Sequence, residues 1–526
     1  MVIRNRGTRP VRIDGFSLEK LAIAETESIV DRTDRWRDQD IAVHSDYSFG
    51  GMSAVNANKV AAWEPDPDYP TQVHYERQTP CVLQVRPPIG PGVVLEPGGS
   101  LRSFRAYLCL HEGTDRESRG LETRKTYRTL APWVLDNPLM LHLTTVDDAE
   151  VRRAIDQCVE VGFEMVILSF GSGLNMEDTS ETNIAKFRAL ADHAHSKGIR
   201  FGGYSLLASR RISETEDVLD PKTGKSGGAI FGNSPCLCGR WGTRYFENIK
   251  TFLERTGFDL LEHDGSYPGD VCASASHPGH AGLQDSQWRQ WERIRDFYGW
   301  CRSRGIYLNV PDWYFLAGSN KTGMGYRETN WSLPRREQRM HARRNLFDGT
   351  WEKTPSMGWM FVPLVEYHGG GPAATIEPLA DHLDDYARIL DTCLGFGAQA
   401  CYRGPRLHDT LATRDMVRAK VRWFRDHRRL LEADIIHLRR ADGRDLDGIL
   451  HVDPDGSPRA MAVFHNPGGN AIERRVEIPT RFIGPDREFV VRMSDGASTR
   501  LRVTASGTLP VRLKVAGDGM AWFTIE

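Results

Sequence analysis

The pattern of apolar and polar positions changes its period twice along the chain. Up to about residue 125, short runs such as residues 81–88 (CVLQVRPP) alternate between apolar and polar side chains and are separated by Pro and Gly turns. This alternation is typical of antiparallel strands with one buried face. Strand-length and helix-length segments then alternate, and the short period returns after about residue 433. We therefore expect an N-terminal β-sandwich over 1–125, an α/β domain over 126–432 and a C-terminal β-sandwich over 433–526.

The middle domain contains seven apolar runs of strand length and one weaker candidate strand, and amphipathic helical segments alternate with them. These runs are 139–145, 165–170, 200–207, 258–265, 306–313, 325–331, 359–367 and 398–404. The sixth strand is the least certain of the eight, because the helix that should follow it has to be formed by residues 334–349. Strands that alternate with helices form parallel sheets, and eight such units fit a closed (β/α)8 TIM barrel. A doubly wound sheet would need a Gly-rich turn after its first strand, and none is present. The predicted fold class is thus multidomain, with a barrel flanked by two antiparallel β-sandwiches.

Composition narrows the classes of partner. Among 526 residues, 68 Lys and Arg balance 70 Asp and Glu, so the chain has no positive field for nucleic acid. No run of about 18 residues lacks charge, which predicts no membrane span. The N-terminus has no apolar signal segment, so we expect a cytoplasmic protein unless the natural start lies upstream. Nine cysteines, an odd number, favour thiols over a disulfide framework. The oligomeric state is not predicted.

Carboxyl groups at strand ends are the first candidates for chemistry, because barrel enzymes react at the C-terminal ends of their strands. The fourth run turns abruptly from Leu261 into Glu262, His263, Asp264 and Gly265. By strand alternation, Glu262 and Asp264 lie on one side and His263 on the other. A carboxylate followed by glycine suits a nucleophile, since substrate can approach closely. The alternative is that Asp264 only caps the following loop.

A nucleophilic carboxylate at a barrel mouth is one half of the catalytic pair of a retaining glycoside hydrolase. Glycoside hydrolysis needs a second carboxyl group as general acid and base. Three residues are candidates: Glu328 in the segment GMGYRETNW, Asp312 at the end of the fifth run, and Glu366 at the end of the seventh. We favour Glu328, because glycines and Tyr326 make its loop mobile and aromatic. Each of the three has the alternative role of a salt bridge to an arginine.

Sugar faces pack on aromatic rings, and polar groups set their orientation. Besides the catalytic pair Asp264 and Glu328, the expected substrate-binding residues are Glu262, His263, Asp312, Trp313, Arg327, Trp331, Glu366, Tyr367 and Arg403. Each of these side chains has a structural alternative in core or loop packing. We expect no cofactor and no metal for the reaction.

A metal site is the rival interpretation of one loop. His263, Asp264, Asp270, His277 and His280 lie within a short span and offer nitrogen and oxygen ligands. No known ligand spacing such as HExxH occurs, and the pair Cys236 and Cys238 lacks a second cysteine pair for a zinc knuckle.

With these residues in view, the chain resembles the α-galactosidase-related clan of glycoside hydrolases (clan D) over nearly its whole length. The clan has an Asp nucleophile that closes the fourth strand, which the resemblance places at Asp264. The lysine or tryptophan that usually stands two positions before it is absent, and Glu262 stands there instead. The clan's acid/base is an Asp in a Gly-rich segment after the fifth strand, where Glu328 stands here. The N-terminal sandwich is shorter than in the larger relatives, which implies a reduced or truncated start.

The resemblance implies an exo-acting retaining α-glycoside hydrolase that is α-galactosidase-like, with an oligosaccharide or glycoside as substrate and no nucleic acid or membrane partner. Two alternatives of other classes stay open. One is a carbohydrate-binding barrel without catalysis, and the other is a metal-dependent barrel hydrolase that uses the histidine-rich loop.

Overall fold

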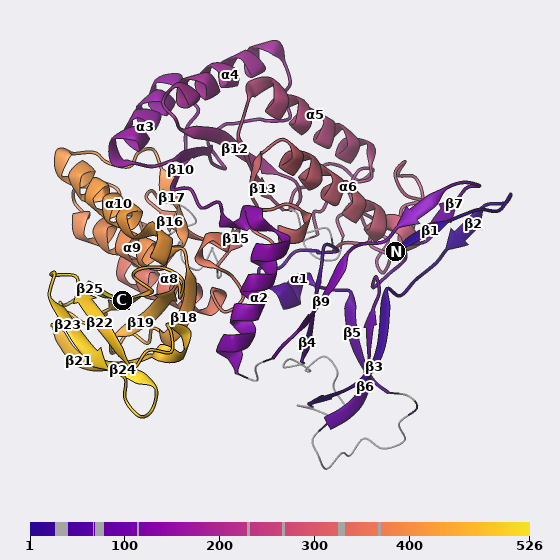
Figure 1. Cartoon of the computed structure of the whole chain (residues 1–526). Coiled ribbons are helices and arrows are strands. Elements are labelled where there is room, and N and C mark those ends of the chain that lie inside the picture. Colours follow the sequence, from indigo (N-terminus) through magenta and orange to yellow (C-terminus); the bar gives the residue numbers. More distant parts are fainter. Residues whose placement is uncertain are drawn as a thin grey trace.

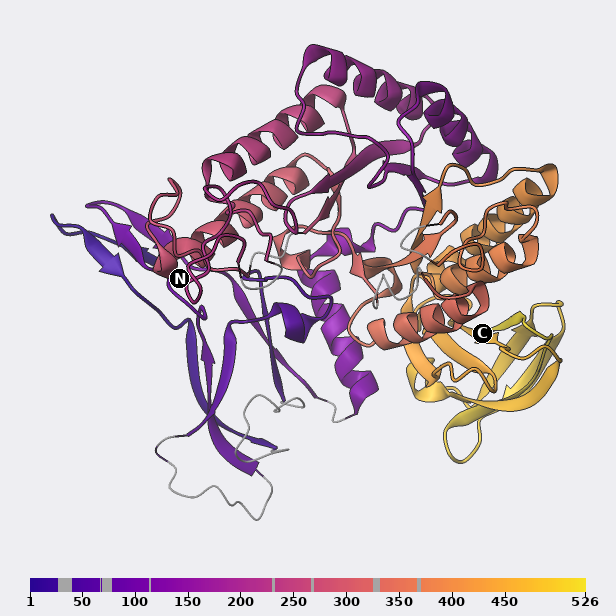
Figure 2. The ribbon, with the colours of Figure 1, turned by 180° about the vertical axis from the view of Figure 1, so that it is seen from behind.

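We describe the chain from a computed structural model. It describes residues 1–26, 40–66, 68, 78–112, 115–228, 232–265, 269–324, 332–366 and 370–526. Figure 1 shows a central domain of strands and helices, with N-terminal strands on one side and a C-terminal β domain on the other. Figure 2 gives the same arrangement from behind.

The central sheet is a barrel of eight parallel strands, as the sequence predicts. Its strands in chain order are β10 (Met140–Leu143), β11 (Met165–Leu168), β12 (Arg200–Leu206), β13 (Leu260–Asp264), β14 (Tyr307–Asn309), β15 (Thr322–Gly323), β16 (Gly358–Pro363) and β17 (Gln399–Gly404). Their order in the sheet runs from β14 through β10 to β15, and a parallel bridge between Asn309 and Lys321 joins the two ends. The predicted fold class, a TIM barrel with antiparallel β domains on both sides, is confirmed.

Seven long helices cover the barrel in the described part of the chain. They are α3 (Asp148–Val161), α4 (Glu181–Ser196), α5 (Arg240–Thr256), α6 (Leu283–Ser303), α8 (Arg335–Gly349), α9 (Leu383–Gly395) and α10 (Leu411–Leu431). Between β14 and β15, a segment that is described in full, the chain forms only the 3-10 turn η3 (Phe315–Ala317). The sixth strand β15 lies just before the predicted run 325–331, which is outside the described residues. Its helix α8 comes after it, as the sequence required.

The barrel interior is filled in layers by alternate residues of the strands. Met140, Met165, Leu260 and Tyr307 form a buried apolar layer at its lower end. The intervening residues, such as Leu141 and Leu261, face the helices and join the main core. This alternation decides which side chain of each strand end reaches the inside.

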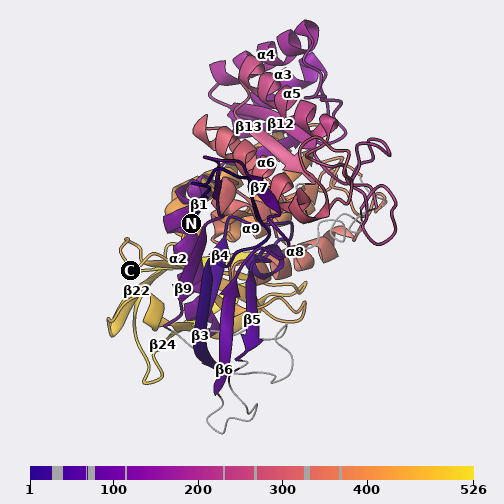
Figure 3. The same cartoon turned by 90° about the vertical axis from the view of Figure 1, so that its right-hand side faces the viewer.

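In the described residues, the N-terminal strands form four small antiparallel sheets. The strands are β1 (Val2–Arg4), β2 (Val11–Ile13), β3 (Glu19–Thr26), β4 (Ile41–Ser45), β5 (Ala61–Pro65), β6 (Gln78–Val85), β7 (Val93–Leu95), β8 (Ser100–Arg102) and β9 (Ala106–Leu110), with the short helix α1 (Ala54–Ala57). They pair as β1 with β8, β2 with β7, β3 with β6 and β5, and β4 with β9. Trp288 and Trp291 of α6 lie in the same core as Tyr47 and Phe104, so these sheets pack on the barrel. Figure 3 shows them beside α6.

The C-terminal domain has a six-stranded sheet in the order β18, β19, β20, β25, β22, β23 and a two-stranded sheet of β21 and β24. The strands are β18 (Asp434–Arg439), β19 (Asp447–Val452), β20 (Ala460–His465), β21 (Ile472–Pro479), β22 (Glu488–Met493), β23 (Ser498–Arg502), β24 (Thr508–Val515) and β25 (Met520–Ile525). Inward side chains of both sheets, among them Leu450, Phe489, Leu509 and Val511, form one core.

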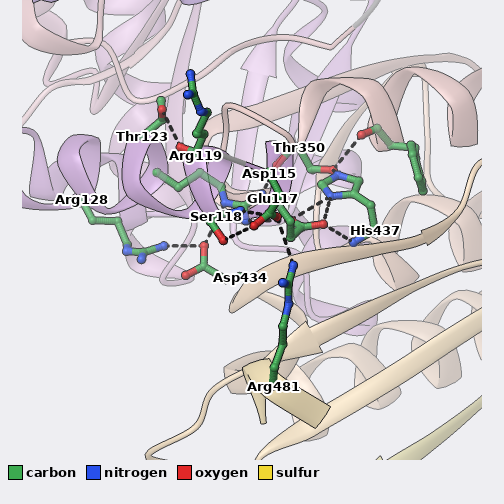
Figure 4. Close-up of polar contacts among 12 residues, drawn as sticks. Asp115, Glu117, Ser118, Arg119, Thr123, Arg128, Thr350, Asp434, His437 and Arg481 are labelled. Atoms are coloured by element: carbon green, nitrogen blue, oxygen red, sulfur yellow. Dashed lines mark hydrogen bonds and ion pairs between the residues drawn. The ribbon is translucent and has the colours of Figure 1, made fainter. Parts of the chain in front are cut away.

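A helix that the sequence pattern did not predict, α2 (Arg116–Leu130), joins the domains. Glu117 of α2 accepts a hydrogen bond from the His437 backbone N–H of β18 at 2.9 Å (Figure 4). The buried Arg124 of α2 pairs with Asp434 at 3.1 Å. The His437 ring also contacts Thr350, which follows α8. The helix crosses the predicted limit between residues 125 and 126; the domain limits stay predictions.

Two further observations concern the helices and the cysteines. None of the described helices is both long and apolar enough to span a bilayer. None of the nine cysteines, all within the described residues, forms a disulfide.

Candidate active site

Asp264 is the last residue of β13, at the C-terminal end of the barrel. Its carboxylate accepts a hydrogen bond from the Tyr204 hydroxyl at 2.9 Å on Oδ2, and one from the Gly265 backbone N–H at 2.9 Å on Oδ1. Its backbone carbonyl accepts from Leu207 N–H at 2.8 Å. Both carboxylate oxygens are thus oriented by donors, while the residue stays partly exposed at the mouth of the barrel.

Gly265 makes the turn after Asp264 possible. Its φ is +75°, and a Cβ there would lie 2.7 Å from the Ala208 backbone nitrogen. A larger residue would therefore be strained and would also clash with the neighbouring loop. The glycine, expected from the sequence to allow close approach of substrate, thus serves the backbone turn.

Glu262 lies one layer below Asp264 on the same inner face. Its Oε2 is 3.1 Å from Nδ1 of His142 on β10, and both side chains are buried. In the strand register Glu262 is level with Tyr204 on β12 and Asn309 on β14. Polar groups thus fill the barrel directly beneath the candidate nucleophile. Since a buried carboxylate needs such partners, this layer supports the floor of the site.

His263 points the other way, into the helix layer. Its Nε2 lies 2.9 Å from the Tyr245 hydroxyl of α5, and its Nδ1 lies 2.9 Å from the Tyr298 hydroxyl of α6. Complete burial lowers the pKa of His263 to about 3, so the imidazole is neutral and accepts one of these bonds. The expectation that His263 contacts substrate does not fit this placement, because alternation along β13 turns it away from Asp264.

A cavity of about 210 Å³ opens beside Tyr204. The described residues that line it include Ser169, Phe170, Tyr204, Leu206 and Arg210. They come from the ends of β11 and β12 and from the loops after them. The cavity is smaller than the pockets of ~300–1,000 Å³ that enclose drug-sized ligands, which favours a small ring as its occupant.

Arg403, at the end of β17, packs against Phe170, one of the residues that line this cavity. Its guanidinium lies 4.1 Å from the centre of the Phe170 ring, and its Nη2 donates to the Phe170 carbonyl at 2.9 Å. Phe170 in turn packs edge-on against Tyr204, with ring centres 5.6 Å apart. Arg403 is therefore linked through Phe170 and Tyr204 to Asp264, and the structure brings these predicted and unpredicted residues together.

The other predicted residues follow other strands of the barrel or lie outside the described part. Asp312 is buried after β14, and Glu366 is exposed after β16. The Trp313 indole donates to the Tyr127 hydroxyl of α2 at 2.8 Å and packs against Phe315, so its described contacts are those of core packing. The residues outside the described ranges are Arg327, Glu328, Trp331 and Tyr367.

Sequence reasoning missed Tyr204, Phe170 and Ser169. Tyr204 stands within a strand rather than at its end, where aromatic residues were sought. The signal that points to it is the period of two: in RFGGYSL, alternate residues face inward, and Leu206 pairs with Asp264 in the register. Such pairing requires the strand order, which the sequence alone does not give.

The rival ligand set of the histidine-rich loop is not assembled as expected. His263 faces the helices, whereas His277 and His280 lie with Cys236 and Cys272. The cysteines, not Asp264, are thus the neighbours of these two histidines.

No protein-family model and no curated protein sequence matches the chain. Solved structures do match it. The α-galactosidase AgaA from Geobacillus stearothermophilus, of family GH36, is 12% identical with a TM-score of 0.60, over 100% of this chain and 76% of that one. The galactosidase domain of the α-galactosidase-sucrose kinase AgaSK is 13% identical with a TM-score of 0.58, over 100% and 74%. An AgaA variant in complex with raffinose gives a TM-score of 0.61 at 12% identity, over 100% and 76%. The chain therefore has the fold of α-galactosidase-related glycoside hydrolases.

Proposed function

We propose that the protein is an exo-acting retaining α-glycoside hydrolase, α-galactosidase-like, with Asp264 as its nucleophile. The observation that carries this proposal is the placement of Asp264: it ends the fourth barrel strand, at the face where barrel enzymes react, with both carboxylate oxygens oriented by Tyr204 and Gly265. The fold it shares with glycoside hydrolases supports the reaction class.

The mechanism is a double displacement. An Asp264 oxygen forms a bond to the anomeric carbon while the bond from that carbon to the leaving oxygen breaks, and the general acid gives its proton to the leaving oxygen. The acid, now a carboxylate, then removes a proton from water, whose oxygen attacks the anomeric carbon and releases Asp264. Two inversions return the starting configuration. We propose Glu328 as this acid and base, with Asp312 and Glu366 as the alternatives.

The wall of the cavity suits a sugar ring. Phe170 and Tyr204 offer aromatic rings, the Arg210 guanidinium offers donors in the same cavity, and the Tyr204 hydroxyl connects the cavity to Asp264. CH-rich faces of sugars pack on such rings, while hydroxyl groups take the donors. A cavity of about 210 Å³ has the size for a single sugar ring rather than a chain of sugars, which supports exo action on an oligosaccharide or glycoside.

The test is hydrolysis of a panel of aryl α- and β-glycosides, with the first-formed anomer followed by NMR. We expect turnover of an α-glycoside, with α-galactosides first, and release of the α-anomer. Asp264→Asn should lose at least about a thousandfold in kcat, because the amide forms no glycosyl ester. Asp178→Asn is the matched control, since Asp178 lies in the loop after β11 and its carboxylate accepts a hydrogen bond from the nearby Ser180 backbone N–H.

Three outcomes would contradict the proposal. Release of the β-anomer from an α-glycoside would show inversion, and near-normal turnover by Asp264→Asn would remove the nucleophile. Sugar binding by calorimetry with no turnover on any glycoside would establish the non-catalytic carbohydrate-binding barrel instead.

A further inference from the structure

Four side chains suited to metal binding meet at the C-terminal face of the barrel. Cys236 comes from the loop after β12, and Cys272, His277 and His280 come from the loop after β13. One ligand atom of each lies within 4.8 Å of those of all the others, and all four residues are buried. They take no part in the hydrolysis proposed above.

Two distances within the cluster match those of a tetrahedral centre, and all the ligand atoms lie within 4.8 Å of one another. Cys236 Sγ lies 3.4 Å from His280 Nε2, and Cys272 Sγ lies 3.3 Å from His277 Nδ1. Around a tetrahedral zinc ion, with bonds of ~2.3 Å to sulfur and ~2.0 Å to nitrogen, ligand atoms stand roughly 3.3–3.8 Å apart. The cluster is therefore close to the size that zinc imposes.

Neighbouring groups hold the ligands in the required orientation. The second ring nitrogen of His277, Nε2, donates to the Thr215 carbonyl at 3.0 Å, so Nδ1 is left as the ligand. The Leu219 backbone N–H points at Cys272 Sγ at 3.3 Å. Outer bonds of both kinds are usual around metal-bound histidine and thiolate.

We propose that Cys236, Cys272, His277 and His280 bind one structural zinc ion. On binding, each thiol releases its proton to solvent and each imidazole binds in its neutral form through one nitrogen. Two sulfur and two nitrogen ligands select zinc among common divalent ions. Four protein ligands fill its tetrahedral coordination and leave no position for substrate, so the role is structural rather than catalytic.

The site ties two loops that flank the candidate active site. The loop after β12 also contains Ala208, which packs against Gly265, and the loop after β13 begins at that glycine. In their described residues neither loop contains a helix or a strand, and the loop after β12 has isolated bridges such as Asp217 to Pro235. A metal ion bound by both loops would hold them in one conformation, as packing in a larger hydrophobic core does elsewhere.

The test is metal analysis of the purified full-length protein by mass spectrometry. We expect one zinc ion per chain in the wild type and less than about a tenth of that in Cys272→Ser. Cys238→Ser is the matched control: this buried cysteine stands two positions from Cys236 and packs in the same small cluster, but it is not one of the four. It should keep its zinc.

A second measurement avoids variants that fail to fold. Wild type stripped of zinc and loaded with Co²⁺ should show the intense visible bands of tetrahedral cobalt together with a thiolate-to-cobalt charge-transfer band. The proposal is overturned if wild type equilibrated with Zn²⁺ under reducing conditions holds none, or if peptide mapping finds a disulfide between Cys236 and Cys272. Equal loss of zinc in Cys238→Ser would also overturn it. None of these results bears on Asp264, so the proposed hydrolase is tested separately.

Discussion

The Tyr204 hydroxyl and the Asp264 carboxylate are joined by a hydrogen bond of 2.9 Å, across adjacent strands of the barrel. Tyr204 also packs on Phe170, so its ring is fixed from two sides. The position of the candidate nucleophile thus depends on a residue that does not itself react.

Loss of this bond should slow hydrolysis without unfolding the protein. Hydrogen bonds to charged groups contribute ~1.5–3 kcal/mol, so Tyr204→Phe should lower kcat/KM by about 10- to 100-fold. The matched control is Tyr307→Phe. Tyr307 belongs to the apolar layer at the other end of the barrel, and its hydroxyl has no hydrogen-bond partner among the described residues. Steady-state kinetics on both variants check this, and equal rates for Tyr204→Phe and wild type would contradict it.

The contact between α2 and the C-terminal domain makes a second prediction, on stability. Arg124 and Arg128 both pair with Oδ1 of Asp434, at 3.1 and 2.7 Å, but Arg124 is completely buried and Arg128 is 28% exposed. Arg124→Met leaves Glu117 and Asp434 without their buried partner and should cost about 3–5 kcal/mol. Arg128→Met should cost at most ~1 kcal/mol. Urea unfolding measures both, and similar losses would contradict the role of burial.

The fold was largely predictable, because its signals are local. Strand alternation and amphipathic helices repeat in every barrel unit, and glycine follows α3 and α5 at residues with positive φ. The pattern failed at α2, whose sequence RESRGLETRKTYRTL has no apolar stripe; its buried face is largely polar and includes Glu117 and Arg124.

The part of the site that could be predicted from the sequence is the part that lies on a single strand, β13. Alternation on β13 correctly separates Glu262 and Asp264 from His263. The partners of these residues come from other strands: Tyr204 from β12 and His142 from β10. The Cys and His cluster is likewise non-local, since Cys236 and His280 are 44 positions apart while Cys272 and His277 are only five apart. No fixed spacing marks such a set.

A third prediction follows from Lys321, a buried lysine where β14 and β15 close the barrel. Its Nζ donates to Asn137 Oδ1 at 2.5 Å and to the Ser356 carbonyl at 2.8 Å. Burial lowers the pKa of Lys321 to about 7, against 10.5 for a free lysine. Between these values the unfolded chain binds more protons than the folded one, so this lysine makes stability rise with pH.

Lys321→Met should remove that slope. The free energy of unfolding of wild type, relative to the variant, should increase from about pH 7.5 to about pH 9.5 by up to about 1.4 kcal/mol per pH unit. Lys186→Met, at an exposed position on α4, is the control and should show no slope. If the free energies of unfolding of Lys321→Met and wild type, measured with urea, changed equally with pH over this range, the prediction would be contradicted.

A fourth prediction separates metal binding from catalysis. Two carboxyl groups suffice for the proposed reaction, so EDTA in the assay should leave the initial rate unchanged. Prolonged removal of zinc should instead lower the melting temperature, because the loops after β12 and β13 lose their link. Immediate loss of activity with EDTA, restored by zinc at an unchanged melting temperature, would support the metal-dependent hydrolase instead.

The last prediction assigns the acid and base. If Glu328 gives its proton to the leaving oxygen, Glu328→Ala should slow substrates with poor leaving groups severely and activated aryl glycosides much less, because a good leaving group departs without a proton. Azide should restore turnover, since a small anion can enter the space of the lost carboxylate and attack the glycosyl-enzyme without a base.

Asp312→Ala and Glu366→Ala are the controls, one buried and one exposed, and neither should show this pattern. Leaving-group dependence and azide rescue in Asp312→Ala, with Glu328→Ala unaffected, would transfer the role to Asp312. The same result in Glu366→Ala would transfer it to the loop after β16, the strand that pairs with β17 and its Arg403.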